Sequence, residues 1–394
     1  MPVRRIVIDR ADRLYHMPPE LCDFISPGRK GLLKRRRDTI DLASFHWPVG
    51  YDSDAQFEGE ALIPASDKQI AALKEELAAW LARTHGVNIA ADKEIAIGGS
   101  GISGLIFRMA LAYIDVGDVA FVPEIGVPLY RACVTACGGS PVPYTLSAKS
   151  EWVFQPERLS SGLGRIARLL FLNSPHNPTG AELSAKQMSE LAWIAGRLNI
   201  LVVNDAAYAS ISARPPASLL SVAGGKKIGV EIGSLAYQFG LPPLSLSYAV
   251  GSREAIAGLD KTARLVPGYI PAYSVDLAIE AIRHFPNDNL LEVRKRLSRA
   301  GSEATALLDL LNLERAGTPS VPFEWAKLER RTPSANLTRT LLRRFKISVA
   351  PGMGFGENGE GFVRFSLLAG PEAFREATKR IRRSRLVRKR EEEQ

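Results

Sequence analysis

The feature that most constrains the fold of this chain is an alternation of short apolar runs with longer helix-like stretches. The apolar runs are EIAIGG (94–99), VAFVPE (119–124), RLLFLN (168–173) and ILVVND (200–205). Stretches with helical periodicity separate them, such as SAKQMSELAWIAGRL before the last run. Short continuous apolar strands separated by helices predict an α/β fold whose mostly parallel sheet is covered on both faces. A ligand of such a sheet binds beyond the carboxyl ends of the strands.

The chain is long enough for two domains that share an interface, since it has 394 residues of which 46% are hydrophobic. Its first twenty residues contain no apolar signal-like run, and no later window is apolar for the ~20 residues that a membrane span needs. We therefore expect a soluble, cytoplasmic protein without a membrane partner. Three cysteines, Cys22, Cys133 and Cys137, are too few and wrongly spaced for a disulfide framework or a zinc site, and no metal is expected.

The formal net charge of +9 is concentrated in two clusters, one between Lys30 and Arg37 and one between Lys379 and Arg390. A basic excess of this kind can indicate a nucleic-acid partner. No aromatic residues are interleaved with either cluster, as a platform for single-stranded nucleic acid requires. We therefore do not expect nucleic-acid binding. The second cluster is followed by EEEQ and is interpreted as a solvated helix end.

Helical patterns flank the alternating region on both sides. Before it, SDKQIAALKEELAAWLART (66–84) has apolar residues at helical spacing, and Ser66 or Asp67 can cap the first turn. This pattern predicts a helix. After about Tyr273 the alternation stops and long helical patterns take over, which indicates a change of domain.

A segment of the chain, SLAYQFGLPPLSLSYAVGS (234–252), resembles the lysine segment of the fold-type I (class I and II) aminotransferases, SxSKxFGLxGxRxGYxxG. These enzymes use pyridoxal 5'-phosphate (PLP). The matching positions are Ser234, Phe239, Gly240, Leu241, Tyr248 and Gly251. Tyr237 stands where the family has the lysine that holds PLP in a Schiff base, and Ser245 stands where it has the arginine that pairs with the cofactor phosphate. The chain is therefore identified as a divergent member that lacks the Schiff-base lysine.

The resemblance implies the fold-type I PLP-transferase architecture, with a large domain that has a mostly parallel sheet and a small C-terminal α/β domain. On this chain it implies an N-terminal arm (1–50) that packs with the small domain, a large cofactor-type domain (51–272) and a small domain (273–394). TIDLASFHWP (39–48) resembles the segment in which the family's arm crosses the mouth of the active site. Because fold-type I proteins usually build their sites across a dimer interface, the resemblance also implies a homodimer.

Two glycine- and proline-containing turns carry further parts of the resemblance. GSGISGL (99–105) follows a predicted strand and opens a helix, so its backbone N–H groups and the helix dipole can bind an anion. Its similarity to the family's TxGxSxAL pattern implies a phosphate site; a tight connection is the alternative reading. The residues of this site are Ser100, Gly101, Ile102 and Ser103. PEIGVPLY (123–130) resembles PxPxYPxY and places Val127 at the aromatic that stacks on the cofactor ring, whereas Tyr130 is kept and is mainly structural in the family.

Two motifs at strand ends imply contacts to the cofactor ring. NSPHNPTG (173–180) is close to the family's NPxNPTG, so that Asn177 would bind the phenolic oxygen of the ring and orient a substrate carboxylate; a stiff turn is the alternative. NDAAYASI (204–211) resembles DExY, with Asp205 at the aspartate that protonates the pyridine nitrogen and Tyr208 at the tyrosine that contacts the phenolic oxygen. A carboxylate is costly to bury without a cationic partner, and a pyridinium is such a partner.

GFVRFSLL (361–368) places Arg364 on the arginine that binds the α-carboxylate of the family's substrates. A guanidinium suits this task because its planar fork binds a carboxylate through two hydrogen bonds. The alternative is a surface arginine on an edge strand.

Transamination in this family uses the lysine both as the Schiff-base amine and as the base that moves a proton. Tyr237 cannot form an imine, and a phenol with an ordinary pKa of ~10 is a poor base at neutral pH. We therefore predict an aminotransferase-like protein that cannot form the usual internal aldimine. Its predicted activity is that of a non-transaminating enzyme, which acts on an amino-acid- or keto-acid-derived substrate without covalently held PLP and uses Tyr237 as catalytic acid or hydrogen-bond donor.

Two alternatives stay open. In one, the protein binds PLP or its amine form, pyridoxamine 5'-phosphate (PMP), noncovalently, which the retained Asp205 favours. In the other, it is a pseudoenzyme that pairs with an active partner, so that enzymatic activity of the chain itself is uncertain. The cofactor hypothesis thus ranges from noncovalent PLP or PMP to no cofactor. The expected ligand is a small carboxylate, and the resemblance implies a role in biosynthesis.

Overall fold

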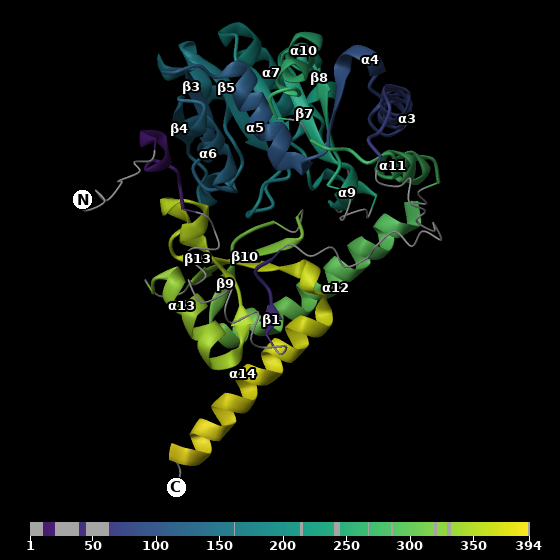
Figure 1. Ribbon diagram of the computed structural model, residues 1–394. Helices are drawn as coiled ribbons and strands as arrows, with labels where there is room; N and C mark the ends of the chain where they lie inside the picture. Colours follow the sequence, from purple (N-terminus) through teal and green to yellow (C-terminus); the bar gives the residue numbers. More distant parts are fainter. Residues whose placement is uncertain are drawn as a thin grey trace, which may run out of the picture.

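The computed structural model describes residues 11–19, 39–44, 63–160, 162–212, 216–239, 245–266, 268–284, 287–318, 321–328 and 332–392. They form two lobes that lie one above the other in Figure 1. The upper lobe contains a large sheet with helices on both sides, and the lower lobe contains a smaller sheet and two long helices (Figure 1). Gly240, Leu241, Cys22 and the basic cluster between Lys30 and Arg37 lie outside the described residues.

Seven described strands form the large sheet, in the order β2-β8-β7-β6-β5-β3-β4. Their bounds are β2 (Ile95–Gly98), β3 (Val119–Pro123), β4 (Ser140–Tyr144), β5 (Ala167–Asn173), β6 (Leu201–Asp205), β7 (Gly229–Ser234) and β8 (Ser247–Gly251). Neighbours are parallel except that β8 runs antiparallel to both β2 and β7. The predicted α/β fold with a mostly parallel sheet is confirmed.

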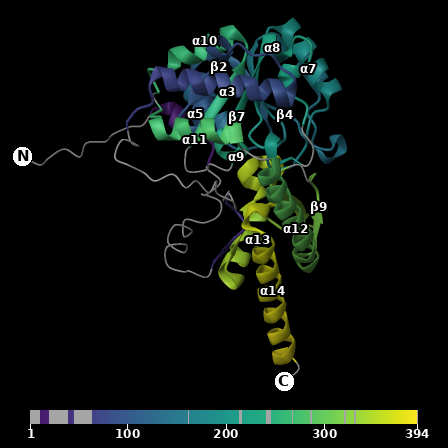
Figure 2. The same ribbon diagram turned by 90° about the vertical axis from the view of Figure 1, so that its right-hand side faces the viewer.

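Successive side chains of a strand point to opposite faces of the sheet. Both faces of this sheet carry apolar side chains, and helices cover both. In β5, Leu169 and Phe171 pack into one core cluster while Leu170 and Leu172 pack into another. The helices that pack on the first side are α5 (Gly101–Tyr113), α6 (Leu129–Ala136) and α10 (Arg253–Thr262). Those on the second side are α7 (Ala185–Leu198), α8 (Gly225–Ile228), α3 (Asp67–His85) and α11 (Ala272–His284). Figure 2 shows α3 and α11 next to each other at the edge of the sheet.

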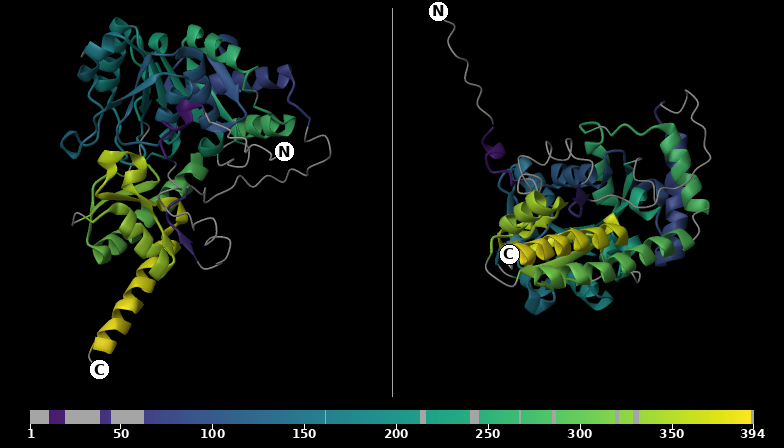
Figure 3. Two further views of the ribbon diagram at one scale, coloured as in Figure 1. Left: turned by 60° about the vertical axis from the view of Figure 1, so that its left-hand side comes forward. Right: turned by 90° about the horizontal axis from the view of Figure 1, so that it is seen from below.

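The smaller lobe is built on an antiparallel sheet in the order β12-β13-β10-β9. Its strands are β9 (Leu313–Arg315), β10 (Phe323–Leu328), β12 (Ala350–Pro351) and β13 (Phe362–Ser366), and its helices are α12 (Asn287–Leu311), α13 (Ser334–Thr340) and α14 (Pro371–Glu392). Helices α12 and α14 lie side by side, which is plain when the molecule is seen from below (Figure 3). A two-stranded pair of β1 (Ile40–Asp41) and β11 (Ile347–Ser348) attaches the N-terminal segment to this lobe.

Local sequence signals account for several helix ends. Helix α3 begins with a capping box, in which Ser66 accepts from the backbone of Gln69 and the side chain of Gln69 accepts in return, and it ends at Gly86 in the left-handed conformation. The predicted helix at 66–84 is therefore confirmed, with Ser66 rather than Asp67 as the cap. The short helices α4 (Ala91–Glu94) and α9 (Leu235–Gln238) each lie next to a strand of the large sheet.

Two absences hold for the described part of the chain. No helix in it is long and apolar enough to cross a membrane. Within the same residues, no group of three or more histidine, cysteine, aspartate or glutamate side chains is placed to hold a metal ion.

Candidate active site

The predicted site residues come from neighbouring strand ends of the large sheet and from one strand of the smaller lobe. Asn177 lies in the turn after β5, Asp205 is the last residue of β6, and Ser234 is the last residue of β7. Tyr237 lies in α9, which follows β7 directly. Arg364 lies in the middle of β13. The parallel strands thus deliver their polar residues to one edge of the sheet, as expected for this class of fold.

A hydrogen-bonded chain links Arg364 to the large lobe. Its Nη1 donates to Oδ1 of Asn177 at 3.0 Å, and Nδ2 of Asn177 donates to the hydroxyl of Tyr208 at 3.0 Å. Arg364 Nη2 donates to the carbonyl of Ala43 at 2.6 Å. The guanidinium carbon lies 4.0 Å from the ring centre of Phe323, so one aromatic face covers the cation.

Arg364 is buried, with 4% of its surface exposed, and β13 has hydrogen-bonded neighbours on both sides. It is therefore not a surface arginine on an edge strand. An amide oxygen and a backbone carbonyl are among the acceptors of its two terminal nitrogens.

Asp205 is a buried carboxyl group held by neutral donors. The hydroxyl of Tyr130 donates to its Oδ2 at 2.7 Å, and the backbone N–H of Ala207 donates to its Oδ1 at 3.0 Å. Burial raises the pKa of Asp205 to about 6, although these two hydrogen bonds act in the opposite direction. No lysine, arginine or histidine forms an ion pair with it among the described residues. The site therefore holds a carboxyl group whose charge the described protein groups do not neutralise.

Tyr237 faces Tyr208 across the site. The two rings are nearly parallel, at an angle of 7°, with centroids 6.4 Å apart. Ser234 caps α9, since its hydroxyl accepts from the backbone N–H of Tyr237 at 3.2 Å. Burial raises the pKa of Tyr237, and the negative charge of Asp205 raises it further. Tyr237 is thus a neutral phenol at neutral pH, suited to donate a hydrogen bond rather than to accept a proton.

The expected phosphate cradle is the turn between β2 and α5. Gly101 begins α5 with φ +65°, and its N–H donates to the carbonyl of Ser245 at 2.7 Å. Ser245 therefore lies beside the cradle, where the resemblance puts the phosphate arginine, but it brings a hydroxyl group without a charge. Ser100 and Ser103 are exposed, and the first-turn N–H groups of any helix have no intrahelical acceptor.

Val127 lines the largest cavity near these residues, a groove of about 740 Å³. Tyr130 and Phe355 line it too. Tyr130 bonds Asp205, and the ring of Phe355 lies 4.9 Å from the guanidinium carbon of Arg364, so these two wall residues stand between the groove and the charged site residues. Its walls come from the β3–α6 connection, from residues 353–358 and from His16, Pro18 and Pro19.

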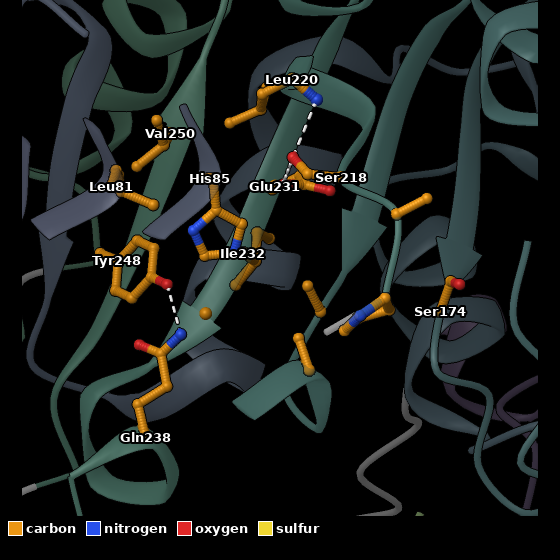
Figure 4. A pocket seen from close by; sticks show the side chains of 15 residues that line it. Leu81, His85, Ser174, Ser218, Leu220, Glu231, Ile232, Gln238, Tyr248 and Val250 are labelled. Carbon is orange, nitrogen blue, oxygen red and sulfur yellow. Dashed lines mark hydrogen bonds between the residues drawn. The ribbon is translucent and has the colours of Figure 1, made fainter. Parts of the chain in front are cut away.

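A second, much smaller cavity lies further along the sheet, between α3 and strands β7 and β8 (Figure 4). Its volume is about 20 Å³, enough for about one water molecule. Its polar groups bond one another: Gln238 Nε2 donates to the Tyr248 hydroxyl at 2.7 Å, and the Ser218 hydroxyl donates to Glu231 at 2.6 Å (Figure 4). No predicted site residue lines it, and it is too small for a ring-sized ligand.

Some residues of the site were not predicted. Tyr130 was interpreted as structural, yet it bonds Asp205 directly. Ala43, Phe323 and Phe355 contact Arg364 from three segments. Apart from the likeness of 39–48 to the family's arm, no local pattern marks these contacts; Ala43 and Phe323 are far from Arg364 in the chain, and Phe355 comes from the preceding turn.

Residues 58–381 match the family model described as "Aminotransferase class I and II". An LL-diaminopimelate aminotransferase of Halothermothrix orenii is 28% identical over 396 aligned residues, which cover 96% of this chain and 99% of that protein. One from Natranaerobius thermophilus is 30% identical and covers 78% of this chain and 80% of its own length.

Two solved structures have the same fold. Substrate-bound BacF from Bacillus subtilis has a TM-score of 0.87 at 22% identity and covers 96% of this chain and 98% of its own. A probable N-succinyldiaminopimelate aminotransferase from Thermus thermophilus has a TM-score of 0.83 at 24% identity, with coverage of 92% and 99%.

These relatives contradict the prediction of a non-transaminating enzyme, and the alternative of a pseudoenzyme falls with it. Proteins that align with this chain over nearly its whole length are named as aminotransferases. The prediction inferred the loss of an entire reaction from three exchanged side chains, Tyr237, Ser245 and Val127. It gave too little weight to Arg364, Asn177, Asp205 and Tyr208, which the fold still brings together.

Proposed function

Because this chain belongs to the class I and II aminotransferase family, we propose that it transfers an amino group between an α-amino acid and a keto acid, with PLP and PMP as noncovalently held forms of its cofactor. The observation that carries this proposal is the hydrogen-bonded chain from Arg364 through Asn177 to Tyr208, next to the buried Asp205. It keeps the carboxylate-binding group and the ring-binding groups of the family within one site.

Arg364 is the proposed anchor for the substrate α-carboxylate. A buried guanidinium binds a carboxylate well, because the carboxylate brings an opposite charge and accepts two hydrogen bonds from the planar fork. Phe323 and Phe355 hold the guanidinium between two rings and so fix the plane of the fork. Asn177 orients the same carboxylate, since its side chain bonds both Arg364 and Tyr208.

The pyridine ring of PLP fits the environment of Asp205. A protonated ring nitrogen would supply the cation that this buried carboxyl group lacks in the described part of the chain, together with a further N–H donor. Asn177 and Tyr208 would hold the phenolic oxygen of the ring. The start of α5, with Ser100, Gly101, Ile102 and Ser103, would hold the phosphate. Bound there, PLP supplies the aldehyde and the electron-withdrawing ring on which amine transfer depends.

The anchoring groups that differ from the family pattern determine how firmly the cofactor is held. Tyr237 offers no amine for a covalent bond, Ser245 offers no positive charge, and Val127 offers no aromatic face. Loss of the charged hydrogen bonds to phosphate weakens binding by roughly 1.5–3 kcal/mol. We infer that the cofactor dissociates during turnover or purification. Tyr237 then acts through its hydroxyl as a proton-bearing donor toward the reacting groups, since its pKa is raised by burial.

The groove beside Val127 supports a substrate with a long, polar side chain. Besides its apolar walls, it is lined by the charged side chains of Glu124, Arg131 and Glu357. Groups of both signs suit a substrate whose far end carries an ammonium and a carboxylate group. Several relatives are named as LL-diaminopimelate aminotransferases, and we propose a diamino dicarboxylic acid of this kind as the amino donor.

The remaining parts of the proposal concern assembly. We propose a cytoplasmic homodimer with an N-terminal arm at 1–50, a large domain at 51–272 and a small domain at 273–394. The packing of α11 (Ala272–His284) with the large lobe, and of α12 with the small one, moves the second boundary of this proposal from 272 to the connection between these two helices.

The cofactor part of the proposal is tested by absorbance between about 300 and 500 nm after equilibration with PLP or PMP and gel filtration. We expect the parent protein to show a bound-cofactor spectrum at equilibrium and to lose it on the column. The variant Tyr237→Lys should retain the PLP band, because the new amine can bond the aldehyde covalently. If PLP and PMP leave the spectrum and the thermal stability of the parent unchanged at every concentration, the protein does not bind this cofactor.

A further inference from the structure

A separate cavity of about 400 Å³ lies where the two lobes meet, behind the candidate active site. One wall is a single face of α12, with Arg294, Ser298 and Thr305 at helical spacing. The facing wall comes from β9 and β10, and Ile211 of the large lobe closes one end. Phe323 separates this cavity from the site: its ring contacts Tyr208 edge-on at 5.5 Å and also lies under the guanidinium of Arg364.

The charges of the cavity do not cancel. Arg315 and Glu324 line it as an ion pair, with Nε and Oε1 2.6 Å apart, and neutralise each other. Arg294 contributes a further positive charge. Its Nη2 donates to the carbonyl of Ser210 at 2.7 Å, whereas its Nε is buried and has no acceptor within the described part of the chain.

Burial lowers the pKa of Arg294, but a guanidinium stays charged at neutral pH. A cation that has lost solvent is stabilised by an anion.

The hydroxyl groups of the cavity are not equivalent. Thr305 and Ser302 donate to the carbonyls of Gly301 and Ser298 in their own helix. Ser298 lies one helical turn after Arg294, on the same face and exposed to the cavity, where its hydroxyl can donate to a ligand that Arg294 binds.

We propose that this cavity binds a small oxyanion, a carboxylate or phosphate group, between the guanidinium of Arg294 and the hydroxyl of Ser298. The anion accepts from the guanidinium of Arg294, which lines the cavity, and balances the positive charge that remains beside the ion pair of Arg315 and Glu324.

Binding there bears on the candidate active site through Ser210. This residue lies in the short helix Ala209–Ile211, directly after Tyr208, and its carbonyl accepts from the same Arg294 side chain. An anion that shifts the guanidinium changes this hydrogen bond and with it the hold on Tyr208. The proposed anion therefore binds a side chain that is one hydrogen bond away from the segment after Tyr208.

The test measures binding of inorganic phosphate and of acetate by calorimetry, at an ionic strength held constant with chloride. Arg294→Gln removes the proposed ligand. Arg299→Gln removes the same charge from an exposed position of the same helix and serves as the matched control. Arg364→Gln removes the carboxylate anchor of the candidate active site, so that binding there is recognised separately.

In the Arg364→Gln background, which lacks the carboxylate anchor of the candidate active site, we expect phosphate or acetate to bind at least about tenfold more weakly when Arg294→Gln is added. Arg299→Gln in the same background should leave the affinity unchanged. Ser302→Glu brings a carboxylate to the rim of the cavity at an exposed position, and should weaken anion binding by repulsion. This variant tests the site even if Arg294→Gln does not fold. Tighter binding of phosphate than of acetate identifies a phosphate-bearing ligand, and the reverse identifies a carboxylate. Equal affinity in the Arg364→Gln background with and without either cavity variant, or no binding to the parent, overturns the proposal.

Discussion

Replacing Arg364 by lysine tests the proposed carboxylate anchor while the positive charge is kept. In the parent protein, the guanidinium of Arg364 donates from Nη1 to Asn177 at 3.0 Å and from Nη2 to Ala43 at 2.6 Å, so both arms of its planar fork are used. A lysine ammonium is a compact charge at the end of a flexible chain and cannot present that fork. The variant therefore loses one charged hydrogen bond to the substrate carboxylate, which is worth about 1.5–3 kcal/mol.

At 1.4 kcal/mol for each factor of ten, this loss raises the KM for the amino acid by about 10- to 150-fold. The assay measures KM and kcat for the amino acid and for the corresponding amine that lacks the α-carboxylate. Arg339→Lys, an exposed position of the same lobe, is the control. The reasoning is refuted if the KM for the amino acid is unchanged, or if the amine loses as much affinity as the amino acid does.

Three further changes test the site and the fold. Burial raises the pKa of Asp205 to about 6 from an ordinary 3.8, so its contribution to the free energy of unfolding is full below pH 3.8 and is lost as the pH rises through 6. The free energy of unfolding of Asp205→Asn, measured by urea unfolding, should rise by up to about 3 kcal/mol relative to that of the cofactor-free parent between pH 4 and pH 7. A difference between the two proteins that does not change with pH would contradict the assignment. Tyr130→Phe removes a hydrogen bond that lowers the pKa of Asp205, and should move this pH transition upward; a transition at the same pH or lower would show that the bond has no such effect. Gly180→Ala should lower the free energy of unfolding more than Gly86→Ala, although both glycines have positive φ. A Cβ at position 180 would lie 2.0 Å from the carbonyl oxygen of Thr318, whereas a Cβ at position 86 would have no surrounding atom within 4 Å. Equal losses of unfolding free energy would count against this contact.

The fold could be predicted from the sequence because its signals are local. The apolar runs at 168–173 and 200–205 became β5 and β6, and the capping pattern at Ser66 marked the start of α3. The antiparallel direction of β8 was not predicted, since strand direction depends on where the chain enters the sheet and leaves no trace in the residues of the strand itself.

The site was predictable only in part. Asn177, Asp205 and Tyr208 lie at strand ends where motifs marked them, and the structure brings Asn177 and Tyr208 into contact. The bond from Tyr130 to Asp205 and the bond from Arg364 to Ala43 join residues that are distant in sequence, so that no spacing rule could reveal them. The prediction of a non-transaminating enzyme failed because it rested on the exchanged positions Tyr237, Ser245 and Val127, whereas the reaction also depends on the groups that bind the carboxylate and the ring.

The most direct test of the proposed function is to follow the amino group itself. The protein is incubated with PLP, a ¹⁵N-labelled diamino dicarboxylic acid and an unlabelled keto acid, and the label in the newly formed amino acid is measured by mass spectrometry. Reactions without protein and with Arg364→Lys serve as controls. We expect label in the product only when protein and PLP are both present, and less of it with the variant. Label at the level of the protein-free reaction, with PLP in excess over the protein, would contradict an aminotransferase that works without a lysine at position 237.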